Sequence, residues 1–142
     1  MRSIWDDMAA MRSLYSAQLD AVGRECGLAR VELDILLFLC NNPQYDRAAD
    51  IVEHRGIAKS HVSLSVKDLE HRKLLERRFE PADRRTTHLE LTAQGRAVTD
   101  EGRQAQLRFF SEIYAGISPE DFAKWREIMQ KIRKNLEGSE VK

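Results

Sequence analysis

The chain has 142 residues and a mass of 16.4 kDa, the size of one ordinary domain with a single compact core. Its composition is 42% hydrophobic and 32% charged with only 7 Gly and 3 Pro, which excludes a disordered, collagen-like or low-complexity chain. No apolar run approaches the ~20 residues of a membrane-spanning helix, and the N-terminal residues lack the apolar region of a secretory signal. Two cysteines are too few for a disulfide framework. We therefore expect a cytoplasmic protein that does not bind membranes.

The net charge of zero conceals an uneven distribution along the chain. Residues 1–53 carry 5 Lys and Arg against 9 Asp and Glu, whereas residues 54–88 carry 9 against 5 and all four histidines. Residues 89–142 are balanced, with 9 of each sign. A basic middle segment between acidic and neutral flanks indicates contact with a polyanion, although a solvated charged face is the simpler alternative.

Helical periodicity dominates the first half of the chain. Ser3 has the features of a helix N-cap, and apolar residues follow it at helical spacing as far as Val22. The next segment is apolar nearly all round, which predicts a buried helix. Asp46 is then expected to cap a short helix. The predicted helices of this half cover residues 3 to about 23–27, 29–41, 46–52 and 59–71.

The period changes to two in the second half. Two alternating segments, 75–79 and 87–91, predict a β-hairpin whose long charged loop covers residues 81–85. Thr92 is expected to cap the long helix that follows. A last helix starts at Ser118, because a capping serine, a proline and two acidic residues form a strong helix start, and it runs to about residue 136.

This order of elements predicts a mainly α fold with a small β-hairpin wing, in a single domain over residues 1–142. Residues 29–92 form a winged helix-turn-helix core, and residues 1–28 and 93–142 add N- and C-terminal dimerisation helices. These outer helices carry apolar stripes that a second copy of the chain would bury, so we expect a two-fold homodimer. The predicted dimer interface consists of Ile4, Met8, Met11, Phe122, Trp125, Met129 and Ile132.

The helix predicted over 59–71 has the residue types of a DNA reader on its outward face. If Val62, Val66 and Leu69 face the core, hydroxyl, imidazole and lysine side chains and one leucine face outward. Such groups suit base edges, phosphates and a thymine methyl, although polar residues also occur on every surface helix. The predicted contacts to the major groove and its phosphates are Lys59, Ser60, His61, Ser63, Leu64 and Lys67.

The charged loop of the hairpin provides a second candidate contact. Arg84 and Arg85 are expected at its tip, where arginine suits the narrow and electronegative minor groove. Asp83 beside them is predicted to act as a brace that holds one guanidinium in place. The alternative is a solvated charged turn.

Four segments together resemble the MarR family of winged helix-turn-helix regulators. They are Lys59-Ser-His-Val-Ser63, Leu69-Glu-His-Arg-Lys-Leu-Leu-Glu-Arg77, Asp83-Arg-Arg85 and Leu91-Thr-Ala-Gln-Gly95. The resemblance covers about residues 33–98. It implies a homodimer that binds a near-palindromic operator on double-stranded DNA, usually as a repressor. It also implies small aromatic or anionic effectors that bind between the dimerisation and DNA-binding regions, or regulation by cysteine oxidation or metal in some members.

The sequence departs from the family pattern at three positions. Leu64 stands where many members carry a basic residue, so one expected DNA contact is missing. Ala58 replaces the usual capping serine, which removes a cap worth about 1 kcal/mol. Lys73 replaces the usual glycine before the first wing strand.

Other kinds of site have less support in the sequence. The four histidines show no metal-ligand spacing, and no nucleophile motif or glycine-rich phosphate loop is present, so we expect no metal, no cofactor and no enzyme activity. Cys40 is expected in the core, and Cys26 is the better candidate for an oxidant sensor. An effector pocket is predicted at Arg12, Tyr15 and Phe38, although aromatic residues at helical spacing more often belong to the core.

The sequence thus predicts a sequence-specific DNA-binding transcription regulator that responds to a ligand or to stress. The alternative is a winged-helix protein-interaction module without specific DNA binding, which the zero net charge and Leu64 would favour.

Overall fold

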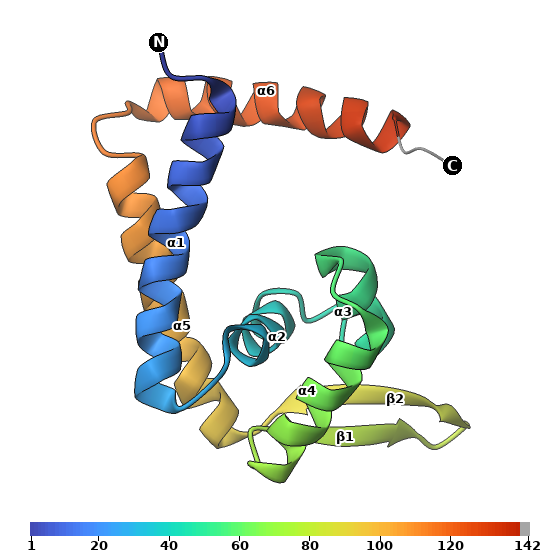
Figure 1. Ribbon diagram of the computed structural model, residues 1–142. Helices are drawn as coiled ribbons and strands as arrows, with labels where there is room; N and C mark the ends of the chain where they lie inside the picture. The colour runs from blue at the N-terminus through green and yellow to red at the C-terminus, as the bar shows by residue number, and fades with distance from the viewer. Residues whose placement is uncertain (140–142) are drawn as a thin grey trace. The chain divides into compact units, whose positions relative to one another are not determined.

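The computed structural model describes residues 1–139, leaving aside the side chain of Arg84. The predicted fold class is confirmed, because the described residues form six helices and one two-stranded antiparallel sheet (Figure 1). In chain order these are α1 (Ile4–Cys26), α2 (Arg30–Asn41), α3 (Ala48–Arg55), α4 (Lys59–His71), β1 (Leu75–Glu80), β2 (Asp83–Leu91), α5 (Ala93–Ile113) and α6 (Pro119–Gly138). Over the described part of the chain, every helix is too short or too polar to cross a bilayer.

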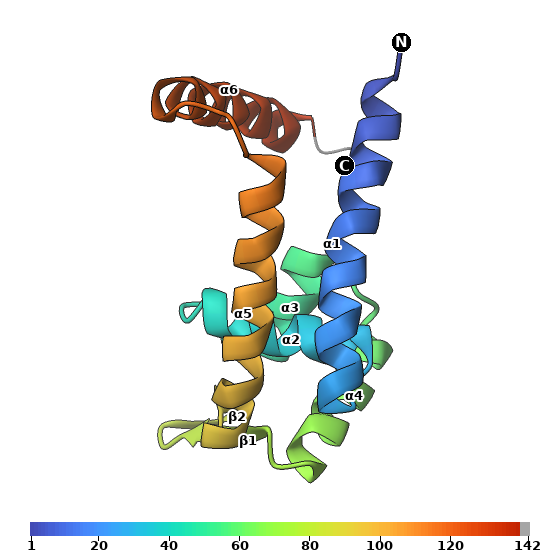
Figure 2. The same cartoon turned by 90° about the vertical axis from the view of Figure 1, so that its left-hand side faces the viewer.

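The chain forms two compact units, Met1–Phe109 and Phe110–Lys142. The first contains α1 to α4, the hairpin and most of α5, and the second contains the end of α5 and α6. Figures 1 and 2 show that α1 and α5 run antiparallel within the first unit. The functional division into residues 29–92 and flanking dimerisation helices stays a prediction.

Helix α2 is the centre of the first unit and contacts α1, α4 and β2. Ile35 and Leu36 belong to a hydrophobic cluster with the inward residues of α4, whereas Leu33 and Leu37 belong to a second cluster with α1 and α5. All four side chains are at most 3% exposed. Burial on both sides explains why this helix is apolar nearly all round, since each buried leucine or isoleucine stabilises the fold by about 1.5–3 kcal/mol.

The predicted helix starts at Ser3, Thr92 and Ser118 are confirmed. Ser3 and Asp6 form a reciprocal capping box, and the Ser118 hydroxyl accepts a hydrogen bond from the Asp121 backbone N–H. Thr92 accepts a hydrogen bond from the Gly95 N–H at 3.0 Å. Ala58, in contrast, gives α4 no side-chain cap.

The prediction that Asp46 caps the short third helix is wrong. That helix begins at Ala48, and Asp50 accepts a hydrogen bond from the Arg47 N–H at 3.1 Å. Asp46 instead contacts the wing, because its carbonyl accepts from the Leu89 N–H at 2.7 Å and its Oδ1 lies 2.7 Å from His88 Nδ1. Because the Asp46 side chain bonds to His88 of β2, it does not cap the helix that follows it.

The hairpin is longer and its loop shorter than predicted. The strands pair from Leu75 opposite Leu91 to Phe79 opposite Thr87, and Glu80 then pairs with Asp83, so residues 84–86 form a bulge. The predicted loop over 81–85 is therefore wrong, since β2 already begins at Asp83 and only residues 81–82 connect the strands.

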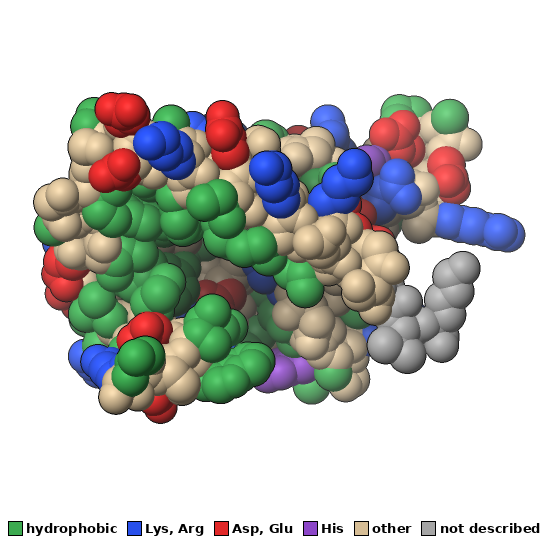
Figure 3. Space-filling model, turned by 90° about the horizontal axis from the view of Figure 1, so that it is seen from above, with side chains coloured by type: hydrophobic (Ala, Val, Ile, Leu, Met, Phe, Trp, Pro, Cys, Tyr) green, Lys and Arg blue, Asp and Glu red, His purple; other side chains and the backbone are tan. Residues whose placement is uncertain are grey.

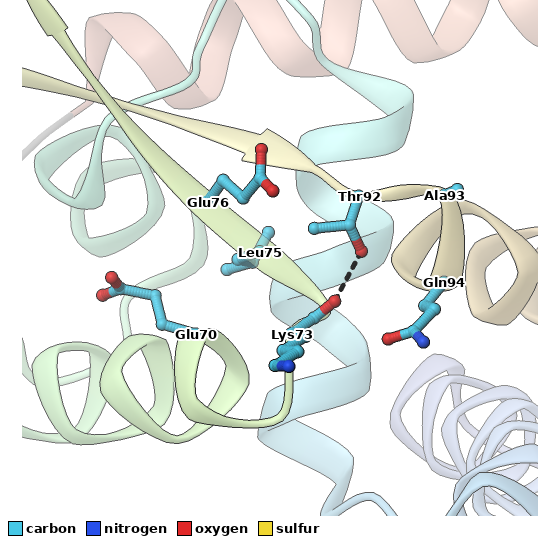
Figure 4. A pocket seen from close by; sticks show the side chains of 7 residues that line it. All are labelled: Glu70, Lys73, Leu75, Glu76, Thr92, Ala93 and Gln94. Carbon is cyan, nitrogen blue, oxygen red and sulfur yellow. Dashed lines mark hydrogen bonds between the residues drawn. The ribbon is translucent and has the colours of Figure 1, made fainter.

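The connection from α4 to β1 is a tight left-handed turn at Lys73, with φ of 61°. The Leu74 N–H donates to the Leu69 carbonyl at 2.9 Å and the Lys73 N–H to the Glu70 carbonyl at 2.9 Å, the two bonds of a Schellman motif. Figure 4 shows the Thr92 hydroxyl donating to the Lys73 carbonyl, at 2.7 Å. This geometry gives the physical reason for the glycine that the family usually carries here.

The start of α5 packs tightly against the same turn. The Thr92 N–H donates to the Leu74 carbonyl at 3.2 Å, and a Cβ atom at Gly95 would collide with that carbonyl oxygen. Only glycine therefore allows α5 to approach the wing this closely.

Candidate nucleic-acid interface

Helix α4 presents the predicted DNA-reading side chains to solvent. Val62, Val66 and Leu69 are at most 1% exposed and hold the helix against the core. The six predicted contact residues are all exposed, namely Lys59, Ser60, His61, Ser63, Leu64 and Lys67. Leu64 is 68% exposed, which leaves a large apolar side chain in water on an otherwise polar face. Its contact with DNA stays a prediction.

The wing carries one described arginine of the predicted pair in an exposed position. Arg85 is exposed at the bulge of β2, whereas the side chain of Arg84 lies outside the described residues. Of the neighbouring arginines on β1, Arg77 pairs with Glu70, and Arg78 Nε lies 3.3 Å from the Glu90 carboxylate.

Asp83 braces the wing through a different contact from the predicted one. Its carboxylate accepts hydrogen bonds from the Arg85 N–H at 3.0 Å and from the Thr86 hydroxyl at 2.7 Å. These two bonds, the Thr86 bond first, lower the pKa of Asp83. They hold the backbone of the bulge, which positions Arg85, while a contact between Asp83 and the guanidinium of Arg84 stays a prediction.

The sequence interpretation missed two residues of this region. The alternating pattern predicts only a strand position for Phe79, yet its side chain is 57% exposed near the end of β1. Arg47 precedes α3 and its charge acts on Asp83. A bulky apolar residue beside a charged turn was the available signal for Phe79, whereas no local pattern identifies Arg47.

The middle of the wing is tied to the helix-turn-helix by His88. This imidazole lies between two carboxylates, with Nδ1 2.7 Å from Asp46 Oδ1 and Nε2 3.1 Å from Glu80 Oε1. Its side chain is only 13% exposed. The contact fixes β2 against the loop that precedes α3.

The predicted effector residues Tyr15 and Phe38 line one cavity of about 170 Å³, but Arg12 does not line it. Two other arginines flank this cavity, since the Arg30 guanidinium lies 5.1 Å from the Tyr15 ring centre and that of Arg55 lies 4.8 Å from the Phe38 ring centre. The remaining lining residues are Asp34, Leu37, Asn41 and Gln106. The long-range packing of α1, α2, α3 and α5 creates this set, so sequence spacing could not reveal it.

Further depressions lie near the interface. One of about 280 Å³ between α3 and α4 is lined by Lys59 and Ser63 together with apolar residues of α3. Another, of about 420 Å³, lies at the turn around Lys73 (Figure 4), where Glu70, Lys73 and Thr92 of its lining make the structural contacts described above.

The two cysteines are both partly buried, so the expectation that Cys40 lies in the core is not met. Burial, followed by the charges of Glu25 and Glu101, raises the pKa of the Cys26 thiol, and Arg72 only partly opposes this. A raised pKa lowers the thiolate fraction, which argues against a reactive sensor at Cys26.

The predicted dimerisation residues are accessible in each unit. In α1, the residues Ile4, Met8 and Met11 are 45–68% exposed. In the second unit, Trp125 and Ile132 are exposed, Phe122 and Met129 are partly buried, and α6 contains no buried residue. Hydrophobic side chains gather on the face shown in Figure 3. Their burial by a second chain stays a prediction.

Comparisons with known proteins agree with the motifs. The model of the MarR family matches residues 27–86. The uncharacterized HTH-type transcriptional regulator YdgJ of Bacillus subtilis is 26% identical over 115 residues, which make up 81% of this chain and 70% of that protein.

Two solved structures share the fold. A putative MarR family regulator from Listeria monocytogenes, complexed with 26mer DNA, has a TM-score of 0.79 and 19% identity and covers 96% of this chain and 90% of that chain. CouR from Rhodococcus jostii, bound to p-coumaroyl-CoA, has a TM-score of 0.71 and 20% identity and covers 93% and 95%. The resemblance drawn from the sequence motifs is thereby confirmed, since residues 27–86 match the model of the MarR family and the fold is shared with solved structures of this kind.

Proposed function

We propose that this protein is a DNA-binding transcription regulator that inserts α4 into the major groove and places its wing in an adjacent minor groove. The observation that carries the proposal is the outward face of α4. Leu64 stands 68% exposed between short hydroxyl side chains and Lys67, a combination that suits a thymine methyl, base edges and phosphates. The relative from Listeria, whose structure contains DNA, shares this fold.

The protein forms a homodimer through the exposed apolar residues of α1 and α6, and this dimer binds DNA. Two copies of α4 about 34 Å apart would read half-sites one helical turn apart, so the operator is a near-palindrome. Occupation of such an operator near a promoter makes the protein a repressor. It has no enzymatic role in this proposal.

The effector site is the cavity lined by Tyr15 and Phe38. Aromatic rings and the guanidinium groups of Arg30 and Arg55 at the same cavity suit a small aromatic anion. Arg30 is held by Asp34 at 2.9 Å and by Asp20 at 3.5 Å, so Arg55 is the better candidate for an ion pair with the ligand. CouR binds p-coumaroyl-CoA, an aromatic and anionic ligand.

The test is a selection of genomic DNA with purified protein, followed by binding to the best site over a salt series. We expect an enriched near-palindrome and an affinity that falls steeply with salt, because phosphate contacts release counterions. Replacing Lys67 or Arg85 by Ala should weaken binding and lower the salt slope by about 1 for each phosphate contact that is lost.

A matched control removes an equal charge from outside the proposed interface. Lys124 on α6 is exposed and lies 3.9 Å from Glu120, so Lys124→Ala should leave the affinity and the salt slope unchanged. If no sequence is enriched and Lys67→Ala and Lys124→Ala bind alike, the chain is instead a winged-helix protein-interaction module.

A further inference from the structure

Arg72 joins the end of the recognition helix α4 to the end of α1, although the two segments lie more than forty residues apart in the chain. Its guanidinium donates one hydrogen bond to the Gly27 carbonyl at 2.7 Å and another to the Cys26 carbonyl at 3.0 Å. Both acceptors are backbone groups at the C-terminal end of α1.

The end of α1 needs such a partner. The Gly23 carbonyl accepts from the Leu28 N–H at 2.8 Å and the Arg24 carbonyl from the Gly27 N–H at 3.4 Å, the two bonds of a Schellman motif. This motif does not use the carbonyls of Cys26 and Gly27. They lie at the negative end of the helix dipole, where a cation with several donors binds well.

Gly27 makes the approach of the arginine possible. It has φ of 67°, in the left-handed region, which turns its carbonyl toward Arg72 at the end of α4. A Cβ atom at this position would lie 3.5 Å from the terminal nitrogen of Arg72, an ordinary contact distance, so the left-handed φ is what favours glycine here.

The other end of the link is equally fixed. Arg72 directly follows α4, its N–H donates to the Asp68 carbonyl at 3.0 Å, and the next residue is the left-handed Lys73. The guanidinium is therefore attached to a backbone that cannot rotate independently of α4.

The buried apolar side chains of the two helices belong to different parts of the core. Leu19 and Val22 of α1 lie in one hydrophobic cluster and Val66 of α4 lies in the other, while the partly buried Cys26 at the end of α1 packs against both. Apolar contacts through α2 are non-directional, so they specify the angle between α1 and α4 less sharply than hydrogen bonds do. Two directional hydrogen bonds from a planar guanidinium define that angle much better.

We propose that Arg72 is a positioning residue for DNA binding, which fixes the recognition helix relative to α1 and so sets the half-site spacing that the dimer accepts. This inference rests on the proposed function, because α1 acts as a reference only if it belongs to the dimer interface. Arg72 itself need not touch DNA.

The test measures affinity as a function of half-site spacing. The operator selected above is compared with derivatives whose half-sites are one or two base pairs further apart, and with an isolated half-site. The proteins are the wild type, Arg72→Gln, Arg72→Lys and the control Arg24→Gln, which removes an exposed cation from the last turn of α1.

We expect the wild type to lose affinity steeply when the spacing changes. Arg72→Gln should bind the native operator about tenfold more weakly and respond to spacing by less than about threefold, with unchanged half-site affinity. Arg72→Lys keeps the charge without the planar fork, so its operator affinity and its response to spacing should lie between those of the wild type and Arg72→Gln. Arg24→Gln should behave as the wild type.

The outcomes separate this inference from the proposed function. A wild type that selects no site overturns both. A wild type that selects a spaced palindrome, together with an Arg72→Gln variant of equal spacing preference, overturns only the role of Arg72. If Arg72→Gln does not fold, the profile of Arg72→Lys decides, because wild-type spacing preference in that variant contradicts the need for a planar fork.

Discussion

Lys73 is a lysine in a conformation that glycine adopts more readily. Its φ of 61° places the Cβ close to the following carbonyl, at a cost of about 1 kcal/mol relative to glycine. The turn is nevertheless kept, because two backbone bonds of the helix end and the bond from Thr92 depend on it.

Lys73→Gly should therefore stabilise the protein. We expect a gain of about 1 kcal/mol, or a melting temperature about 3 °C higher, measured by circular dichroism. Lys73→Ala is the matched control, since it removes the same charge but retains a Cβ, and it should gain nothing. A melting temperature of Lys73→Gly below that of the wild type would contradict the backbone strain inferred at Lys73.

At the scale of one element, the wing depends on a bulge that a single carboxylate organises. Asp83 holds both the Arg85 N–H and the Thr86 hydroxyl, and residues 84–86 have no partners in the strand register. Loss of this carboxylate should disorder the bulge without disturbing the buried core.

Asp83→Ala should weaken operator binding by about three- to tenfold while leaving the melting temperature nearly unchanged. Amide hydrogen exchange at Arg85 should become faster, and Asp83→Asn, which retains an acceptor oxygen, should show a smaller effect. Because the hydrogen bonds lower the pKa of Asp83, its contribution is complete above the ordinary carboxyl pKa and is lost only as pH falls through the lowered value. Unchanged binding and exchange in Asp83→Ala would rule out this role.

At the scale of the whole molecule, α6 has no buried residue of its own although it carries an apolar stripe. Met129 and Ile132 lie on this stripe outside the aromatic contacts of Tyr114, Phe122 and Trp125. Charged residues at these two positions should therefore prevent dimer formation without unfolding the helix.

The double variant Met129→Glu and Ile132→Glu should sediment as a monomer at micromolar concentration, with wild-type helix content and weaker operator binding. Lys131→Glu is the control, because it introduces the same charge between the two positions at an exposed site. A stable dimer of the double variant would show that the interface lies elsewhere.

Sequence reasoning succeeded where the signal is local. The bounds of α4 and its inward residues followed from periodicity alone, and Lys73 was recognised as unusual through the family pattern. It failed for Asp46 and for the loop of the wing, because Leu89 and Thr86 offered competing partners. The cavity arginines and the bonds of Arg72 join segments distant in sequence, so no spacing rule could identify them.

The contact at Gly95 has a consequence for how movement passes through the molecule. The base of the wing, at the Leu74 carbonyl, is in direct backbone contact with the start of α5 at Thr92 and Gly95. They form a rigid corner in place of a hinge. A rotation of the start of α5 would therefore move both strands of the wing together with it.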